Sequence, residues 1–127
     1  MNIQEAIDEN SNLYAAALNH WGEEVMLRWL QEEATELALA ASHYHRNKIP
    51  KEELLDEAAD TLVMILQIAR HLGTEEFCEA VHQKTLRLIE KVRDEAPFVK
   101  ETNQRVSQKG NNHGIRGRNL GFEASSQ

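Results

Sequence analysis

The sequence is poor in the residues that build several common classes of protein. Its 127 residues include one cysteine, two prolines and 6% aromatic residues. The lone Cys78 excludes an intrachain disulfide framework and a cysteine-based zinc site, and it favours a reduced, cytoplasmic setting. No stretch reaches the roughly 18 consecutive apolar residues of a membrane span. The acidic start, MNIQEAIDEN, lacks the basic and apolar regions of a signal peptide, so we expect no association with membranes.

Positive charge is also scarce, and it is unevenly distributed. Residues 1–102 hold ten Lys and Arg against twenty Asp and Glu, a net charge of −10. Residues 103–127 carry a net charge of +3 and four of the six glycines, with little apolar periodicity. The acidic body disfavours binding to duplex nucleic acid. We predict a helical domain at residues 1–102 and an extended basic, Gly-rich tail at residues 103–127.

Apolar residues at helical spacing, with start and stop signals, predict four helices. His20, Trp21 and Gly22 are predicted to end the first helix. Pro50 fits the first turn of the third helix, and Gly73 fits the left-handed residue that often follows a helix. No run alternates in the manner of a strand, so the predicted fold class is all-α. The expected helices are residues 3–19, 23–44, 50–72 and 74–95.

Two acidic pairs interrupt the apolar second and third helices. Glu33 and Glu36 lie three residues apart, as do Glu57 and Asp60, so each pair projects from one face of its helix. The short connection between the helices favours an antiparallel hairpin. In one such packing the two pairs face each other, with Glu32 at the edge of the cluster.

So many carboxylates in one place require compensation. Either their pKa values rise until they hold protons, or cations neutralise them. Oxygen ligands without matched cysteine or histidine favour Mg²⁺, with Mn²⁺ as a substitute. A solvated acidic face is the usual meaning of a single ExxE, but both segments here are otherwise apolar almost all round. That pattern is typical of buried helices, and it favours burial against a second subunit.

The segments EEATE at residues 32–36 and EAAD at residues 57–60 resemble the EExxE…ExxD signature of the all-α nucleoside triphosphate pyrophosphohydrolases. This superfamily includes MazG, the dCTP pyrophosphatases, the dimeric dUTPases and phosphoribosyl-ATP pyrophosphohydrolase, and the resemblance covers roughly residues 20–95. It implies a four-helix MazG-like bundle that assembles as a homodimer or a dimer of dimers. The implied activity is Mg²⁺-dependent hydrolysis of an NTP or dNTP to the nucleoside monophosphate and pyrophosphate.

The resemblance also implies roles for individual residues. Glu32 would orient or deprotonate the attacking water, or ligate a further ion, so Glu32 and Glu33 form the predicted catalytic pair. Lys84 stands at a family lysine position, where it would bind phosphate, but Leu88 replaces the asparagine that often follows. The implied metal ligands are Glu33, Glu36, Glu57 and Asp60.

Other candidates for substrate binding lie outside the acidic helices. Trp21 precedes the second helix, where the resemblance implies an aromatic group that stacks on the base; the alternative is a packing residue at the corner between the first two helices. Arg116 and Arg118 of the tail would supply contacts that Leu88 cannot make. His43 and His45 lie near the end of the second helix, where the helix dipole favours cationic side chains. This effect accounts for both residues, so neither is assigned a role as a metal ligand.

Two alternatives remain open at the level of the sequence. The Leu88 departure favours a non-catalytic helical dimer of the same fold, acting as a binding or regulatory module. Glu79 and His82 form one ExxH, the spacing used in di-iron bundles, but such sites need a second ExxH and the sequence has none.

Overall fold

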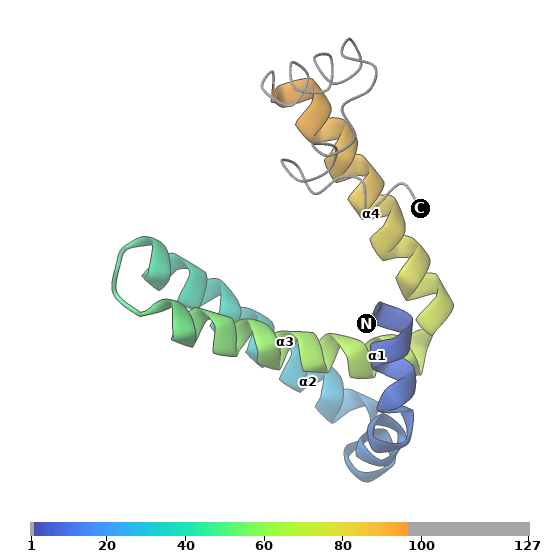
Figure 1. The fold of residues 1–127 in the computed structure, drawn as a ribbon. Coiled ribbons are helices and arrows are strands. Elements are labelled where there is room, and N and C mark those ends of the chain that lie inside the picture. The colour runs from blue at the N-terminus through green and yellow to red at the C-terminus, as the bar shows by residue number, and fades with distance from the viewer. Residues whose placement is uncertain (1, 97–127) are drawn as a thin grey trace. The chain divides into compact units, whose positions relative to one another are not determined.

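The fold is all-α, as the sequence predicts. The computed structural model describes residues 2–96. Within these residues the chain divides into two compact units, with the boundary between Cys78 and Glu79. No helix of the described part is long and apolar enough to cross a membrane. The helices are α1 (Ile3–Glu9), α2 (Ser11–His45), α3 (Lys51–Leu72) and α4 (Thr74–Glu95) (Figure 1).

The predicted extent of the first helix is wrong, because the chain breaks at Asn10. The helix α1 begins with a capping box: the Asn2 side chain accepts the Glu5 backbone N–H at 2.8 Å, and the Glu5 carboxylate accepts the Asn2 N–H at 3.0 Å. At the other end, the Asn10 side chain donates to the Ala6 carbonyl at 3.1 Å. Such local bonds between side chain and backbone compete with continuation of a helix. A new helix therefore starts at Ser11.

The predicted stop at Gly22 is present as a break within α2. Gly22 has φ 84° and ψ 164°, a non-helical conformation that glycine adopts without the strain a Cβ would cause. One contact on each side of the break ties α2 to the last turn of α3. The Arg70 guanidinium donates to the Ser11 hydroxyl at 2.9 Å, and the His71 Nε2 lies 3.4 Å from the Glu23 carboxylate. Both segments of α2 are thereby held against α3.

Two clusters of buried side chains form the core of the first unit. The first joins α1 and the start of α2 to α3, and the second joins the remainder of α2 to α3. Helices α2 and α3 therefore lie side by side as an antiparallel hairpin (Figure 1). The clusters consist of Ile7, Tyr14, Leu66 and Ala69, and of Met26, Met64 and Ile68.

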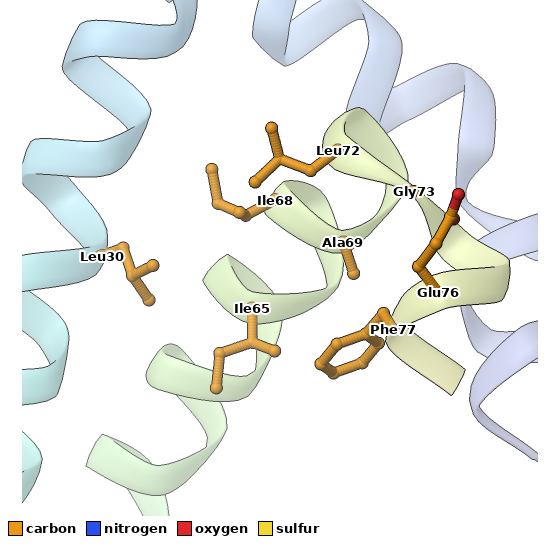
Figure 2. Close-up of a pocket in the computed structure, with 8 residues that line it drawn as sticks. All are labelled: Leu30, Ile65, Ile68, Ala69, Leu72, Gly73, Glu76 and Phe77. Atoms are coloured by element: carbon orange, nitrogen blue, oxygen red, sulfur yellow. The ribbon is translucent and has the colours of Figure 1, made fainter. Parts of the chain in front are cut away.

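An apolar cavity of about 310 Å³ lies beside the second cluster. Its wall includes Leu30 of α2, Ile65 and Leu72 of α3, and Phe77 near the start of α4 (Figure 2). All of its lining residues belong to the first compact unit. Leu72 is 66% exposed, so this end of the hairpin presents apolar surface to its surroundings.

The Met26→Ala variant is expected to lower the free energy of unfolding by about 2–5 kcal/mol. The Met26 side chain is 1% exposed, so its truncation leaves a cavity in the second cluster. Urea denaturation at a fixed metal concentration measures the change. Leu13→Ala is the control, because Leu13 is 65% exposed and its loss should cost no more than about 0.5 kcal/mol. Equal losses in the two variants would contradict the placement of Met26 in the core.

Candidate metal centre

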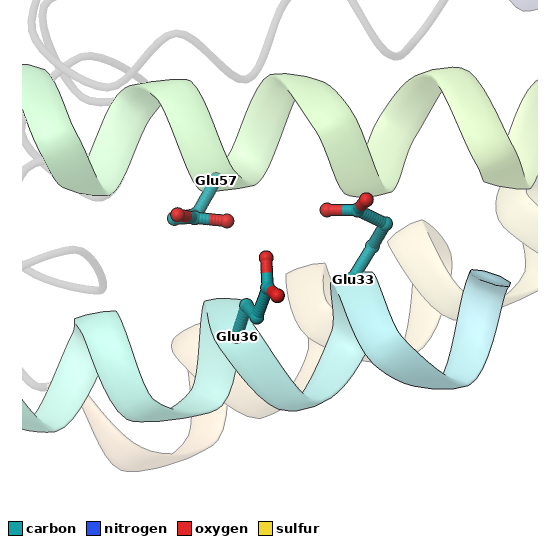
Figure 3. Close-up of side chains that lie close together, drawn as sticks. All are labelled: Glu33, Glu36 and Glu57. Carbon is teal, nitrogen blue, oxygen red and sulfur yellow. The ribbon is translucent and has the colours of Figure 1, made fainter.

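Three carboxylates meet between α2 and α3. Glu33 and Glu36 project from α2, and Glu57 projects from α3 toward them (Figure 3). One oxygen from each side chain lies within 4.8 Å of the other two. Ligands on opposite sides of an octahedral Mg²⁺ lie about 4.2 Å apart, twice the bond length, so small side-chain movements would let one cation contact all three.

Two of these carboxylates are partly buried, and one oxygen of each has no hydrogen-bond partner among the described residues. The Oε2 atoms of Glu33 and Glu57 are shielded from solvent, and neither accepts a hydrogen bond from any residue in the range 2–96. Buried carboxylate oxygens normally have donors, because an ionised carboxylate is expensive to remove from water. The all-oxygen ligand set and the two orphaned atoms fit a hard divalent cation such as Mg²⁺ or Mn²⁺.

The ionisation of the same two residues reflects their surroundings. Burial raises the pKa of Glu33 above its ordinary value of 4.5, and the charges of Glu36 and Asp60 raise it further. Burial likewise raises the pKa of Glu57, and the same two neighbours add to the effect. Both carboxyls therefore hold protons more strongly than in water unless a cation compensates their charge.

Asp60 and Glu32 lie beside the three carboxylates and are exposed. The charge of Asp60 acts on the pKa of both Glu33 and Glu57, whereas that of Glu32 acts on Glu33. Glu32 also shares a shallow groove along α2 with Glu36. The ligand role of Asp60 and the catalytic role of Glu32 remain predictions.

A buried threonine connects the two helices at the carboxylates. Thr61 is 6% exposed, and its hydroxyl lies 3.1 Å from the Glu33 carbonyl and 2.9 Å from the Glu57 carbonyl. A side chain of α3 thus bonds to the backbone of α2 at a residue that carries one of the carboxylates. Sequence reasoning missed this role. The signal was a hydroxyl residue within an apolar stretch, four residues after Glu57.

The Thr61→Val variant is expected to weaken Mn²⁺ binding by about 10–100-fold, the usual effect of losing a group that supports a ligand. Loss of the shared hydrogen bond should also lower the free energy of unfolding by about 1 kcal/mol. Calorimetric Mn²⁺ titration measures the affinity. Thr35→Val is the matched control, because the exposed Thr35 hydroxyl bonds at 2.7 Å to the Gln31 carbonyl of its own helix. Equal Mn²⁺ affinity in both variants would show that Thr61 does not position the carboxylates.

The predicted substrate-binding residues lie in different parts of the chain. Trp21 is 47% exposed, and its ring packs edge-on against Trp29 with centroids 5.0 Å apart. Trp29 lies four residues before Glu33, so these two share a face of α2. Lys84 belongs to α4 within the second compact unit. The roles of these residues stay predictions, and the predicted Arg116 and Arg118 lie outside the described residues.

The chain therefore falls in a class of all-α proteins in which both helices of a hairpin contribute carboxylate oxygens to a candidate site for a divalent cation. Within that class, the chain belongs to the phosphoribosyl-ATP pyrophosphohydrolase family, whose model matches residues 2–85. The predicted relationship to the all-α NTP pyrophosphohydrolase (MazG-like) superfamily is thereby confirmed. The family consists of hydrolases that act on pyrophosphate bonds and in general depend on a metal. Comparisons with curated proteins and with solved structures found no match.

Proposed function

We propose that the chain is a Mg²⁺-dependent nucleoside triphosphate pyrophosphohydrolase, with Mn²⁺ as a possible replacement for Mg²⁺. The observation that carries this proposal is the meeting of Glu33, Glu36 and Glu57, two of which have a buried oxygen with no donor in the described part of the chain. An acidic site repels a polyphosphate unless cations lie between the two. Family membership supports the reaction class, and the carboxylates support the need for a cation.

The proposed reaction adds water across a phosphoanhydride bond. The water oxygen bonds to one phosphorus, the bridging P–O bond breaks with its electron pair on the departing phosphate, and the proton of the water passes to a base. Bound divalent cations supply charge neutralisation of the phosphates and a more acidic water. Glu32 is assigned to orient that water or to accept its proton. The assigned metal ligands are Glu33, Glu36, Glu57 and Asp60.

The nucleoside is proposed to lie at the Trp21 end of the site. A nucleobase stacked on the exposed Trp21 ring would gain about 1–3 kcal/mol. The supporting observation is the contact of Trp21 with Trp29, which shares a helix face with the carboxylates. Lys84 and the tail residues Arg116 and Arg118 are proposed as phosphate or sugar contacts.

A nucleotide panel tests the proposed function. The purified chain is incubated with Mg²⁺ and each NTP, each dNTP or phosphoribosyl-ATP, and the products are separated by ion exchange. Monophosphate and pyrophosphate in equal amounts are expected. Orthophosphate as the only phosphate product, without contaminating pyrophosphatase, would contradict the proposal. Running the reaction in ¹⁸O-labelled water identifies the attacked phosphorus, because the label stays on the product that contains it.

We also propose that the chain assembles as a homodimer or a dimer of dimers. Four large aliphatic side chains of the α2–α3 hairpin are 47–63% exposed, and such surface is typical of subunit interfaces. Light scattering after size exclusion should give at least twice the 14.5 kDa chain mass, and Leu62→Glu should shift the species toward monomer. A monomeric wild type would contradict this. The alternative function, a non-catalytic helical dimer that acts as a binding or regulatory module, predicts the same mass but no hydrolysis of nucleotides. The four side chains are Leu39, Leu55, Leu62 and Val63.

A further inference from the structure

A second cavity continues the site toward the loop end of the α2–α3 hairpin. Its volume is about 160 Å³, and its wall includes Glu36 and Glu57 of the carboxylate cluster together with His43, Glu53 and Ile49. A cavity of about 150 Å³ accommodates a benzene ring, and a phosphate group is no bulkier than that ring. The cavity therefore has room for a phosphate group next to the carboxylates.

His43 is the hydrogen-bond donor among the side chains of this cavity. The other polar lining groups are carboxylates, which only accept hydrogen bonds when ionised. The partly buried His43 ring makes no hydrogen bond or ion pair with any described residue. Its backbone is held in place, because the Lys48 N–H donates to the His43 carbonyl at 2.8 Å in the turn after α2.

The cavity and the tryptophans lie at opposite ends of the carboxylate cluster. Trp29 precedes Glu36 by seven residues and His43 follows it by seven, so all three share one face of α2. At 1.5 Å per residue, each interval spans about 10.5 Å of the helix axis. The face therefore presents an aromatic surface, then the carboxylates, then the His43 ring, whose N–H has no partner among residues 2–96.

We infer that the His43 cavity holds the terminal phosphate of the nucleotide, with the His43 ring donating a hydrogen bond to one of its oxygens. This inference builds on the proposed function and fixes the direction in which the substrate lies. An aromatic base belongs with Trp21 and Trp29, so the phosphate chain extends past the cluster toward His43. Because Glu53 also lines the cavity, the phosphates enter as their divalent-cation complex. The feature of the sequence that could have indicated this role is the spacing of seven residues between Glu36 and His43, which places both on one helix face.

Binding of the two products to the full-length chain tests this direction. The probes are inorganic pyrophosphate and the monophosphate of the nucleotide hydrolysed fastest (AMP if none is hydrolysed), each titrated calorimetrically with Mn²⁺ present. His43→Ala should weaken pyrophosphate binding about tenfold or more, and leave monophosphate binding within about twofold. Trp21→Ala should do the opposite. His43→Gln retains an N–H donor and should restore part of the loss, and the control His45→Ala, at an exposed position outside the cavity, should match wild type.

The outcomes separate this inference from the proposed function. If the wild type hydrolyses nucleotides and His43→Ala binds pyrophosphate as tightly as wild type, the inference is overturned and the proposed function stands. The same follows if His43→Ala loses monophosphate binding and keeps pyrophosphate binding. A wild type that binds Mn²⁺ but no pyrophosphate would overturn it too. Absence of hydrolysis with every nucleotide would overturn the proposed function, and the pyrophosphate titration of His43→Ala would then decide the cavity on its own.

Discussion

The Glu36→Gln variant is expected to lower kcat/KM for nucleotide hydrolysis by about a thousandfold. Glu36 has an oxygen within 4.8 Å of those of both Glu33 and Glu57, and its charge raises the pKa of both. The substitution keeps the size of the side chain and removes its charge. The contribution of a bound cation to catalysis is several kcal/mol, and each 1.36 kcal/mol corresponds to a factor of ten in rate. Initial rates over a range of Mg²⁺ concentrations measure the loss.

Glu52→Gln is the matched control for this experiment. Glu52 is exposed in the first turn of α3 and lies outside the cluster, so its variant should keep kcat/KM within about twofold. Partial recovery of Glu36→Gln at high Mg²⁺ would agree with weakened ligation. Wild-type kcat/KM together with wild-type Mn²⁺ affinity in Glu36→Gln would contradict the assignment of Glu36 to a metal centre.

Much of the hairpin and its acidic site was predictable, because both depend on local spacing. Residues three apart share a helix face whatever surrounds them, so Glu33 and Glu36 were expected together. The breaks at Gly22 and after Leu72 were expected because glycine tolerates positive φ, and the structure has φ 84° at Gly22 and 151° at Gly73. These features require no knowledge of tertiary contacts.

Features that depend on a partner distant in the sequence were not predicted. Thr61 is 28 residues from Glu33, and only the packed hairpin brings its hydroxyl to that carbonyl. His43 was assigned no ligand role because it lies near a helix end. Its position in a cavity depends on the packing of α3 and could not be predicted from that helix alone. The break at Asn10 was missed for another reason. The segment DENSN at residues 8–12 interrupts the apolar pattern, but that interruption alone did not indicate that the Asn10 side chain bonds to the Ala6 carbonyl and ends the helix there.

The carboxylate cluster has opposite consequences for stability and for binding. The buried Oε2 atoms of Glu33 and Glu57 have no donor within residues 2–96, so the ionised forms of these side chains destabilise the metal-free protein. The same unsatisfied oxygens are available to a cation. Such a protein is less stable without metal and more stable with metal bound, because a metal that binds only the folded state stabilises that state.

Without metal, the free energy of unfolding is therefore expected to fall as the pH rises above 4.5. In the unfolded chain, Glu33 and Glu57 lose their protons near the ordinary value of 4.5, whereas in the folded chain their raised pKa values keep the protons to higher pH. The folded state binds more protons in this interval, so a rise in pH favours unfolding. The contribution is fully present below 4.5 and is lost as the pH passes through the raised values. Thermal denaturation in EDTA from pH 4.5 to about pH 8 measures the decline.

Saturating Mn²⁺ is expected to reverse most of this decline. At a concentration one hundred times its Kd, a ligand of the folded state adds about 2.7 kcal/mol of stability. The gain should increase with pH, because fewer protons then compete with the cation for the carboxylates. Glu57→Gln removes one titrating group and one ligand, so its stability in EDTA should depend less on pH and its gain from Mn²⁺ should be small. Glu52→Gln should behave as wild type in both measurements. The amide of the variant neither titrates in this range nor neutralises a cation. A decline of stability with pH of equal size in Glu57→Gln and wild type would therefore contradict the raised pKa of Glu57. An equal gain of stability from Mn²⁺ would contradict the role of Glu57 as a ligand.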